Sequence, residues 1–290
     1  MRNKKIIDIH THPGFHGYSA NKIVQNMDEY GIDISCLLSW EAPLNDYDPA
    51  TRHSFSPFSD SPVSFESCVA CKEKAPDRFL LGYAPDPRLP DSIAKLKSDM
   101  SLYNINMYGE LKLRMMYDNR DAIRMYRFCG ENALPVLMHF DYELDCGSYP
   151  WPNYWYGGGI EVLERVLALC PETTFIGHAP GFWAHISNDD LYKTESYPKT
   201  PVVPGGKIEA LLEKYPNLYC DISADSGHNA LNRDHEYTRV FLETWQDRVL
   251  FGRDYFDNIH QSLLNNLSLS AQALEKIFAG NALRILRMDT

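Results

Sequence analysis

The sequence predicts a closed (β/α)8 barrel, in which eight parallel strands alternate with helices. Three observations predict this fold. Short apolar runs alternate with amphipathic segments eight times along the chain. The length of 290 residues is typical of one such barrel. The first run ends in His10-Thr11-His12-Pro13-Gly14, as expected where a strand opens into a loop that carries function.

The expected strands are short apolar runs, the first of them rich in β-branched residues. They cover 5–10, 33–38, 79–84, 108–113, 135–140, 173–177, 218–222 and 248–252. Amphipathic segments between them predict helices at 20–30, 64–74, 91–102, 120–132, 159–169, 207–215 and 233–245, with 271–286 closing the chain. Strands that alternate with helices indicate βαβ units and a parallel sheet. We therefore expect residues 1–290 to form a single domain.

Two long loops stand out, at 41–62 after the second strand and at 141–158 after the fifth. Both follow a strand, so both are expected on the C-terminal face, where the sites of such barrels are built. The second loop is dense in aromatic residues. Its Trp151 and Trp155 are expected to form an apolar lid that contacts substrate. The alternative is that they form a contact between the subunits of a homo-oligomer.

Composition and charge narrow the class of protein. The chain is 44% hydrophobic and 23% charged, as in an ordinary soluble domain, and no apolar run approaches the ~20 residues that span a membrane. The net charge of −11 argues against nucleic acid or an anionic membrane as a partner, so a small-molecule partner is expected.

Two further observations predict a reducing, cytoplasmic location. The chain begins with lysines and a strand instead of a signal peptide. Its seven cysteines are odd in number and scattered. Cys68-x-x-Cys71 is the one close pair, and without a second pair it is expected to consist of buried thiols.

Side chains that bind metals follow several of the expected strands. Residues i and i+2 of a strand share one face, so His10 and His12 should project together. His139 ends the fifth strand, His178 the sixth, and Asp254 the eighth. Imidazole and carboxylate groups that meet at one end of a barrel are suited to a divalent transition metal. Each alone could cap a loop or a helix, but their joint placement predicts a metal site.

The fourth strand adds charged side chains to the same interior. In Gly109-Glu110-Leu111-Lys112-Leu113-Arg114, the leucines share one face and the charged residues share the other. The leucines should face the helices, which leaves Glu110, Lys112 and Arg114 facing inward. Buried charges are costly unless they are paired or bind something, and a metal or a carboxylate substrate would account for them. The alternative is a Glu110–Lys112 pair that only closes the barrel.

Together these motifs resemble the fingerprint of the amidohydrolase superfamily. The ordered set is His10-Thr11-His12, Met138-His139, Ile176-Gly177-His178 and Phe251-Gly252-Arg253-Asp254. The closer resemblance is to the amidohydrolase-2 branch, which includes enzymes like aminocarboxymuconate-semialdehyde decarboxylase, and the segment 276–286 resembles the usual end of that branch. The resemblance runs from residue 5 to about residue 287 but leaves the two long loops uncovered.

The resemblance implies roles for individual residues. His10, His12 and His139 would bind a divalent metal, most often zinc, and Asp254 would bind the metal or take a proton from its water. His178 would contact that water or the substrate, or bind a second metal. Binuclear members use a bridging lysine or glutamate from the fourth strand. Glu110 and Lys112 are both candidates for this bridge, so the resemblance implies either one or two ions. Arg253 stands where smaller residues are common and would add a positive charge near the site.

The sequence therefore predicts a metal-dependent hydrolase acting on a small, carboxylated molecule. Zinc with an open position lowers the pKa of its water to about 7, a carboxylate such as Asp254 can accept the proton, and His178 can stabilise an oxyanion. Lys112, Arg114 and Arg253 would bind the substrate's charge. The first alternative is a non-oxidative decarboxylase or hydratase on the same scaffold. The second is a catalytically silent barrel that binds a metal or ligand.

Overall fold

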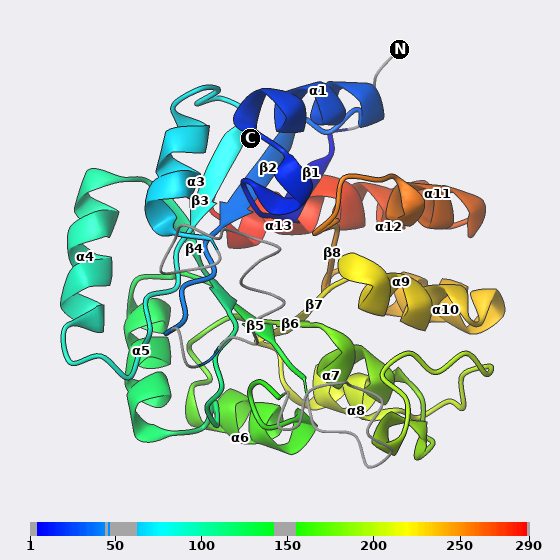
Figure 1. Ribbon diagram of the computed structural model, residues 1–290. Coiled ribbons are helices and arrows are strands. Elements are labelled where there is room, and N and C mark those ends of the chain that lie inside the picture. Colours follow the sequence, from blue (N-terminus) through cyan, green and yellow to red (C-terminus); the bar gives the residue numbers. More distant parts are fainter. Residues whose placement is uncertain (1–4, 44–45, 47–62, 142–154, 289–290) are drawn as a thin grey trace.

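The computed structural model describes residues 5–43, 46, 63–141 and 155–288. Eight parallel strands follow one another around a (β/α)8 barrel in the order of the sequence (Figure 1). Backbone hydrogen bonds from Ile9 N to Phe251 O (3.1 Å) and from Asp254 N to His10 O (2.8 Å) join the two ends of the sheet. The strands are β1 Ile7–Thr11, β2 Ile34–Leu38, β3 Phe79–Gly82, β4 Ile105–Leu111, β5 Val136–His139, β6 Phe175–His178, β7 Leu218–Asp221 and β8 Val249–Leu250.

Helices surround the strands (Figure 1). They are α1 Ala20–Tyr30, α3 Phe65–Lys72, α4 Ser92–Leu102, α5 Arg120–Glu131, α6 Ile160–Leu169, α7 Pro180–Trp183, α8 Lys207–Lys214, α9 Ala224–Asn232, α10 His235–Thr244, α11 Ile259–Asn266, α12 Ala271–Glu275 and α13 Asn281–Ile285. The expected helix at 271–286 is divided by a π-helical turn at Lys276–Gly280. Helices α7, α9 and α11 were not predicted; α9, ADSGHNALN, is rich in residues of low helix propensity.

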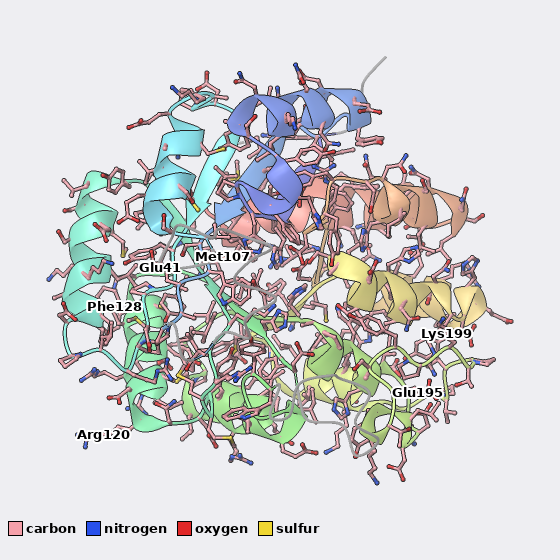
Figure 2. All side chains as sticks on the ribbon, viewed as in Figure 1. Glu41, Met107, Arg120, Phe128, Glu195 and Lys199 are labelled. Atoms are coloured by element: carbon pink, nitrogen blue, oxygen red, sulfur yellow. The ribbon has the colours of Figure 1, made fainter. Side chains whose placement is uncertain are left out.

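Two apolar layers explain why the chain folds this way. The helices pack on the outside of the strands, and Leu111 and Leu113 belong to this outer layer as predicted. A second cluster is built mainly from side chains of seven strands: Ile7, Ile9, Cys36, Leu38, Met107, Leu137, Ile176, Tyr219 and Leu250. Figure 2 shows Met107 near the middle of the barrel and Arg120 at its periphery. These packed side chains make the interior a solid support for polar groups at the strand ends.

The fourth strand begins and ends at other residues than predicted. It runs Ile105–Leu111 instead of 108–113, so Lys112 and Arg114 follow the strand. The hydroxyl of Tyr117 explains its end, because it donates to Leu111 O at 2.7 Å and accepts from Leu113 N at 3.3 Å. These bonds satisfy backbone groups that would otherwise continue the ladder.

The cysteines and helices meet two further expectations. All six cysteines in the described ranges are buried and free, including Cys68 and Cys71. Among the helices of the described ranges, none is both long and apolar enough to cross a bilayer.

A buried histidine outside the strand ends predicts pH-dependent stability. His185 is 5% exposed, and burial lowers its pKa to about 4. Below its ordinary pKa of 6.5, the unfolded chain binds a proton that the folded protein excludes, so stability falls as pH falls from 6.5 toward 4. This group should remove about 2 kcal/mol of unfolding free energy between pH 7 and pH 5.

Urea unfolding of wild type and His185→Phe at both pH values checks this, because phenylalanine keeps a ring beside Tyr192 but cannot titrate. The wild type should lose about 2 kcal/mol more than the variant. Equal losses in both proteins would contradict the assignment.

Candidate metal centre

His10 and His12 direct their Nε2 atoms at each other from the end of β1. The two Nε2 atoms lie 3.1 Å apart. His12 Nδ1 lies 2.9 Å from Leu38 O, and His10 Nδ1 lies 2.8 Å from Asp221 Oδ2. A carbonyl or carboxylate oxygen only accepts, so in neutral rings both Nδ1 atoms carry the protons and both Nε2 atoms present lone pairs. This is the arrangement in which neighbouring groups orient histidines that bind metals.

Asp254 brings a carboxylate to the same point from the segment after β8. Its Oδ1 lies 3.6 Å from Nε2 of both His10 and His12. Burial opposes protonation of His10, but the charge of Asp254 and the hydrogen bond to Asp221 leave the pKa of His10 raised. The site therefore favours a positive charge beside these rings.

Glu110 lies between the histidines. Its Oε2 is 3.3 Å from His12 Nε2, and its Oε1 is 2.7 Å from His139 Nδ1 and 3.7 Å from His178 Nε2. The residue is only 3% exposed. Burial raises its pKa, but the interactions with His139 and His12 hold the pKa of Glu110 well below its ordinary value. A buried, ionised carboxylate between histidines is suited to bridging cations.

His178 shares a second carboxylate with His10. Asp221, at the end of β7, lies 3.2 Å from His178 Nδ1 and 2.8 Å from His10 Nδ1. Ser223 Oγ donates to the same carboxylate at 2.7 Å. Burial raises the pKa of Asp221, but the hydrogen bonds with both histidines lower it well below the ordinary value. Asp221 thus sets the orientation of two rings.

His139 contacts two carboxylates. Its Nδ1 faces Glu110, and its Nε2 lies 2.8 Å from Asp141 Oδ2. The geometry brings it beside Glu110 but does not group it with His10, His12 and Asp254. Asp141 was not predicted, although His139-Phe140-Asp141 repeats the i, i+2 spacing of His10 and His12 and could have revealed it.

Lys112 lies close to these residues even though it follows the strand. Its ammonium is 4.3 Å from the ring centre of Trp40 and 5.4 Å from that of Tyr156. Burial lowers its pKa, but the charge of Glu110 and of other nearby acidic groups leaves the pKa raised. The Trp40 Nε1–H donates to Lys112 O at 3.0 Å, which holds this segment in place.

Arg253 and Arg114 are the two other cations expected to bind substrate. Arg253 is fully buried and donates to Asp8 Oδ2 at 2.8 Å and to Asn26 Oδ1 at 2.8 Å. It has no exposed surface for a substrate, so the geometry does not support the expected charge beside the metal. Arg114 Nε is buried with no hydrogen-bond partner within the described ranges, and no contact places its guanidinium in the centre.

The base of the aromatic loop reaches the same region. Tyr156 pairs with Asp141 through backbone hydrogen bonds at 3.1 and 2.8 Å, and its ring lies 5.6 Å from that of His139. Trp155 is half-buried. Trp151 lies outside the described residues.

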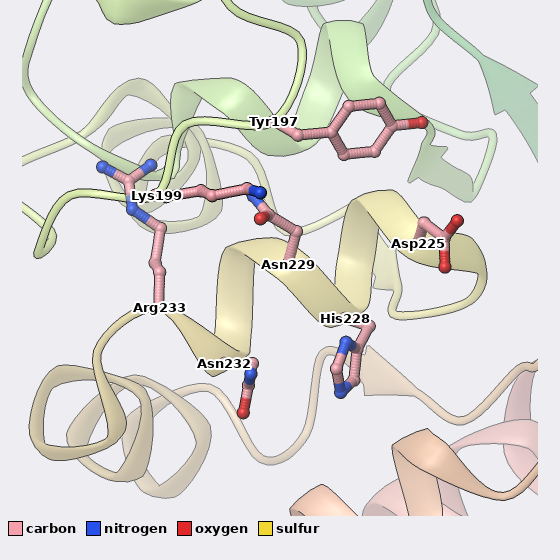
Figure 3. Close-up of a pocket in the computed structure, with 7 residues that line it drawn as sticks. All are labelled: Tyr197, Lys199, Asp225, His228, Asn229, Asn232 and Arg233. Carbon is pink, nitrogen blue, oxygen red and sulfur yellow. The ribbon is translucent and has the colours of Figure 1, made fainter.

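A separate groove runs along α9 (Figure 3). It is lined by Tyr197, Lys199, Asp225, His228, Asn229, Asn232 and Arg233. None of these side chains belongs to the groups described above.

The donor cluster consists of His10, His12, Glu110, His178 and Asp254. Its ligand atoms fall into two sets that share His10: His10, His12 and Asp254, and His10, Glu110 and His178. Within each set the ligand atoms all lie within 4.8 Å of one another. Lone pairs and carboxylates without a cation between them repel, so the chemistry of this set fits one or two divalent metal ions.

The fold and the donor cluster define a (β/α)8 protein whose metal-binding side chains lie at the carboxyl ends of the strands. Comparison with protein families identifies the family of this chain. The amidohydrolase family model matches residues 7–288. The chain belongs to the amidohydrolase family, in its amidohydrolase-2 branch. Membership of this family indicates a metal-dependent enzyme.

Three solved structures illustrate the likeness. An uncharacterised TIM-barrel protein from Bordetella bronchiseptica is 20% identical, with 98% of this chain and 99% of that chain covered and a TM-score of 0.65. A dihydroxybenzoic acid decarboxylase from Polaromonas sp. JS666, with bound manganese and the inhibitor 2-nitroresorcinol, is 17% identical, with coverages of 99% and 98% and a TM-score of 0.62. An amidohydrolase from Burkholderia multivorans with bound zinc is 13% identical, with coverages of 98% and 100% and a TM-score of 0.58. At these identities the likeness shows the fold. No curated protein matches the chain.

Proposed function

We propose that this protein is a metal-dependent hydrolase that acts on a small, carboxylated molecule. The observation that supports it best is the pair of facing Nε2 atoms of His10 and His12, 3.1 Å apart. Their other ring nitrogens face Asp221 and Leu38 O, so the facing atoms present lone pairs beside the carboxylate of Asp254. Such a point is suited to a cation.

The donor cluster would hold one or two divalent ions. His10, His12 and Asp254 form one set, and His10, Glu110 and His178 form the other. His139 would join through its contact with Glu110. Zinc is the expected ion from the nitrogen and oxygen ligands, and manganese, bound in the Polaromonas protein, is the alternative. When bound, such an ion lowers the pKa of water and polarises a carbonyl.

The residues of this chain supply the remaining chemistry. Asp254 accepts a proton from the attacking water, since its carboxylate is next to the rings that would hold the metal. His178, oriented by Asp221, presents Nε2 to the same space and orients that water or binds a second ion. Lys112 pairs with a carboxylate of the substrate.

The contribution of Lys112 can be measured. Lys112→Met should raise KM by about 10- to 100-fold, the effect of losing a hydrogen bond to a charged group, while metal content stays unchanged. Lys112→Arg should restore part of the loss. Lys95→Met is the matched control, because Lys95 also lies over an aromatic ring, 5.3 Å from the centre of Tyr83, but outside the donor cluster. Equal KM values for Lys112→Met and wild type would remove Lys112 from the substrate site.

Non-oxidative decarboxylation is the second candidate. It is favoured by the likeness to the Polaromonas decarboxylase and by Asp254, which could deliver a proton to carbon as well as accept one from water. Hydration without bond cleavage is a related alternative on the same scaffold.

One experiment separates these functions. Metal-stripped protein is reloaded with Zn²⁺ or Mn²⁺ and incubated in H₂¹⁸O with carboxylated amides, esters, lactones and hydroxybenzoates. Hydrolysis places ¹⁸O in a cleaved product. Release of CO₂ with no label in the organic product would replace the hydrolase by a decarboxylase. Metal binding without turnover of any compound would favour a catalytically silent barrel.

A further inference from the structure

One buried carboxylate, Asp8, connects β1, which carries His10, with the segment after β8, which carries Asp254. Asp8 is fully buried, and its Oδ1 accepts from His10 N at 3.1 Å and from Arg253 N at 3.0 Å. Its Oδ2 accepts from Thr11 Oγ1 at 3.1 Å and from Arg253 Nε at 2.8 Å. All four donors belong to residues at, or next to, His10 and Asp254.

The geometry points to Asp8 and Arg253 as positioning residues for the donor cluster, an inference that rests on the metal site of the proposed function. Neither side chain contacts a ligand atom of the cluster. Instead they hold the backbone on which His10 and Asp254 stand. The distance between those two side chains, 3.6 Å from Nε2 to Oδ1, therefore depends on the Asp8–Arg253 pair.

The backbone of Asp254 shows why such support is needed. Its φ is +62°, in the left-handed region that side chains other than glycine rarely occupy. An unfavourable conformation persists only where the surroundings determine it. Asp254 N donates to His10 O at 2.8 Å, and the preceding Arg253 N donates to Asp8, so two consecutive backbone groups bind β1.

The far side of Arg253 secures the segment that follows Asp254. Its Nη1 donates to Asn26 Oδ1 at 2.8 Å, and Asn26 Nδ2 donates to Phe256 O at 2.6 Å. Nη1 also lies 3.4 Å from Asp257 O. Asp254 thus stands between two anchored points, Arg253 on one side and residues 256–257 on the other.

A purely structural role for the ion pair is the alternative. Buried ion pairs often contribute little net stability, and β1 and β8 also meet through the bond from Ile9 N to Phe251 O. A structural role predicts that loss of the pair changes stability alone. A positioning role predicts that it also changes the affinity and geometry of the metal site.

The test measures binding of Mn²⁺ and Zn²⁺ to metal-stripped protein by calorimetry, together with the visible absorption of the Co²⁺ form. Arg253→Met and Asp8→Asn should weaken metal binding by about 10- to 100-fold, as loss of groups that orient metal ligands does, and should change the Co²⁺ spectrum. Arg253→Lys should recover part of the affinity, because lysine can still donate to Asp8. Asn26→Ala leaves the ion pair intact and should weaken binding less, which keeps the test usable if the charge variants do not fold.

Leu96→Ala is the control, because Leu96 is fully buried in α4, which contributes no side chain to the donor cluster. All variants are measured at a temperature where they are folded. Equal metal affinity and equal Co²⁺ spectra in wild type, Arg253→Met and Asn26→Ala would overturn the inference. Wild-type protein that binds no divalent metal would instead overturn the proposed function.

Discussion

His10→Ala is expected to lower the metal content and to lower kcat/KM by at least about 1,000-fold. His10 belongs to both sets of candidate ligands, and its Nε2 can bind one ion, so its loss removes a ligand from the ion that it holds. A metal ion contributes several kcal/mol to stabilising a transition state, and each 1.36 kcal/mol is a factor of ten in rate. The alanine variant also leaves Asp221 without one of its two imidazole partners.

Metal analysis of the purified protein and steady-state kinetics measure this effect together. His228→Ala is the matched control, because His228 lines the groove along α9 and lies outside the donor cluster. The control should keep full metal content and activity. Full metal content in His10→Ala would contradict the assignment of His10 as a ligand and would move the site elsewhere on the barrel.

The strand periodicity explains why part of this centre could be predicted. Alternation along a strand places His10 and His12 on one side whatever the surrounding loops do, and the Nε2 atoms do lie 3.1 Å apart. The same reasoning applied to His139 and Asp141 would have found a further contact of 2.8 Å. Periodicity is thus most informative where a short, buried strand ends at the site.

Positions next to a turn could not be predicted in the same way. Arg253 precedes a left-handed residue at Asp254, and its guanidinium donates to Asp8. Strand alternation does not identify the partner of such a buried guanidinium. The end of β4 depends similarly on the hydroxyl of Tyr117, a contact that no local pattern reveals. Side-chain hydrogen bonds therefore decided the cases in which the prediction differs from the structure.

Asp221 shows a third reason why the site could not be predicted in full from the sequence. A position at the end of β7 puts a residue near the site but does not by itself distinguish substrate contact from support. The structure decides in favour of support, because the carboxylate accepts from Ser223 and contacts two histidine rings. A residue that orients ligands can be recognised only when the positions of its partners are known. Here the partners are His10 and His178, which belong to β1 and β6.

Glu110→Gln is expected to lower the metal stoichiometry from about two ions to about one and kcat/KM by about 100- to 1,000-fold. Glutamine keeps the shape of Glu110 but removes the charge that lies 2.7 Å from His139 and 3.3 Å from His12. A neutral amide bridges two cations poorly, and several kcal/mol of charge stabilisation would be lost. The remaining ion should stay with His10, His12 and Asp254, which form a set without Glu110.

Elemental analysis after dialysis gives the stoichiometry, and kinetics at saturating metal gives the rate. Glu41→Gln is the matched control, because Glu41 is a partly buried carboxylate that accepts from Phe65 N at 2.9 Å but lies outside the donor cluster. If one ion is bound in both wild type and Glu110→Gln, Glu110 does not bridge two ions. Unchanged activity as well would make Glu110 a buried partner of Lys112 and the histidines, because a carboxylate that holds a catalytic ion cannot lose its charge without affecting the rate.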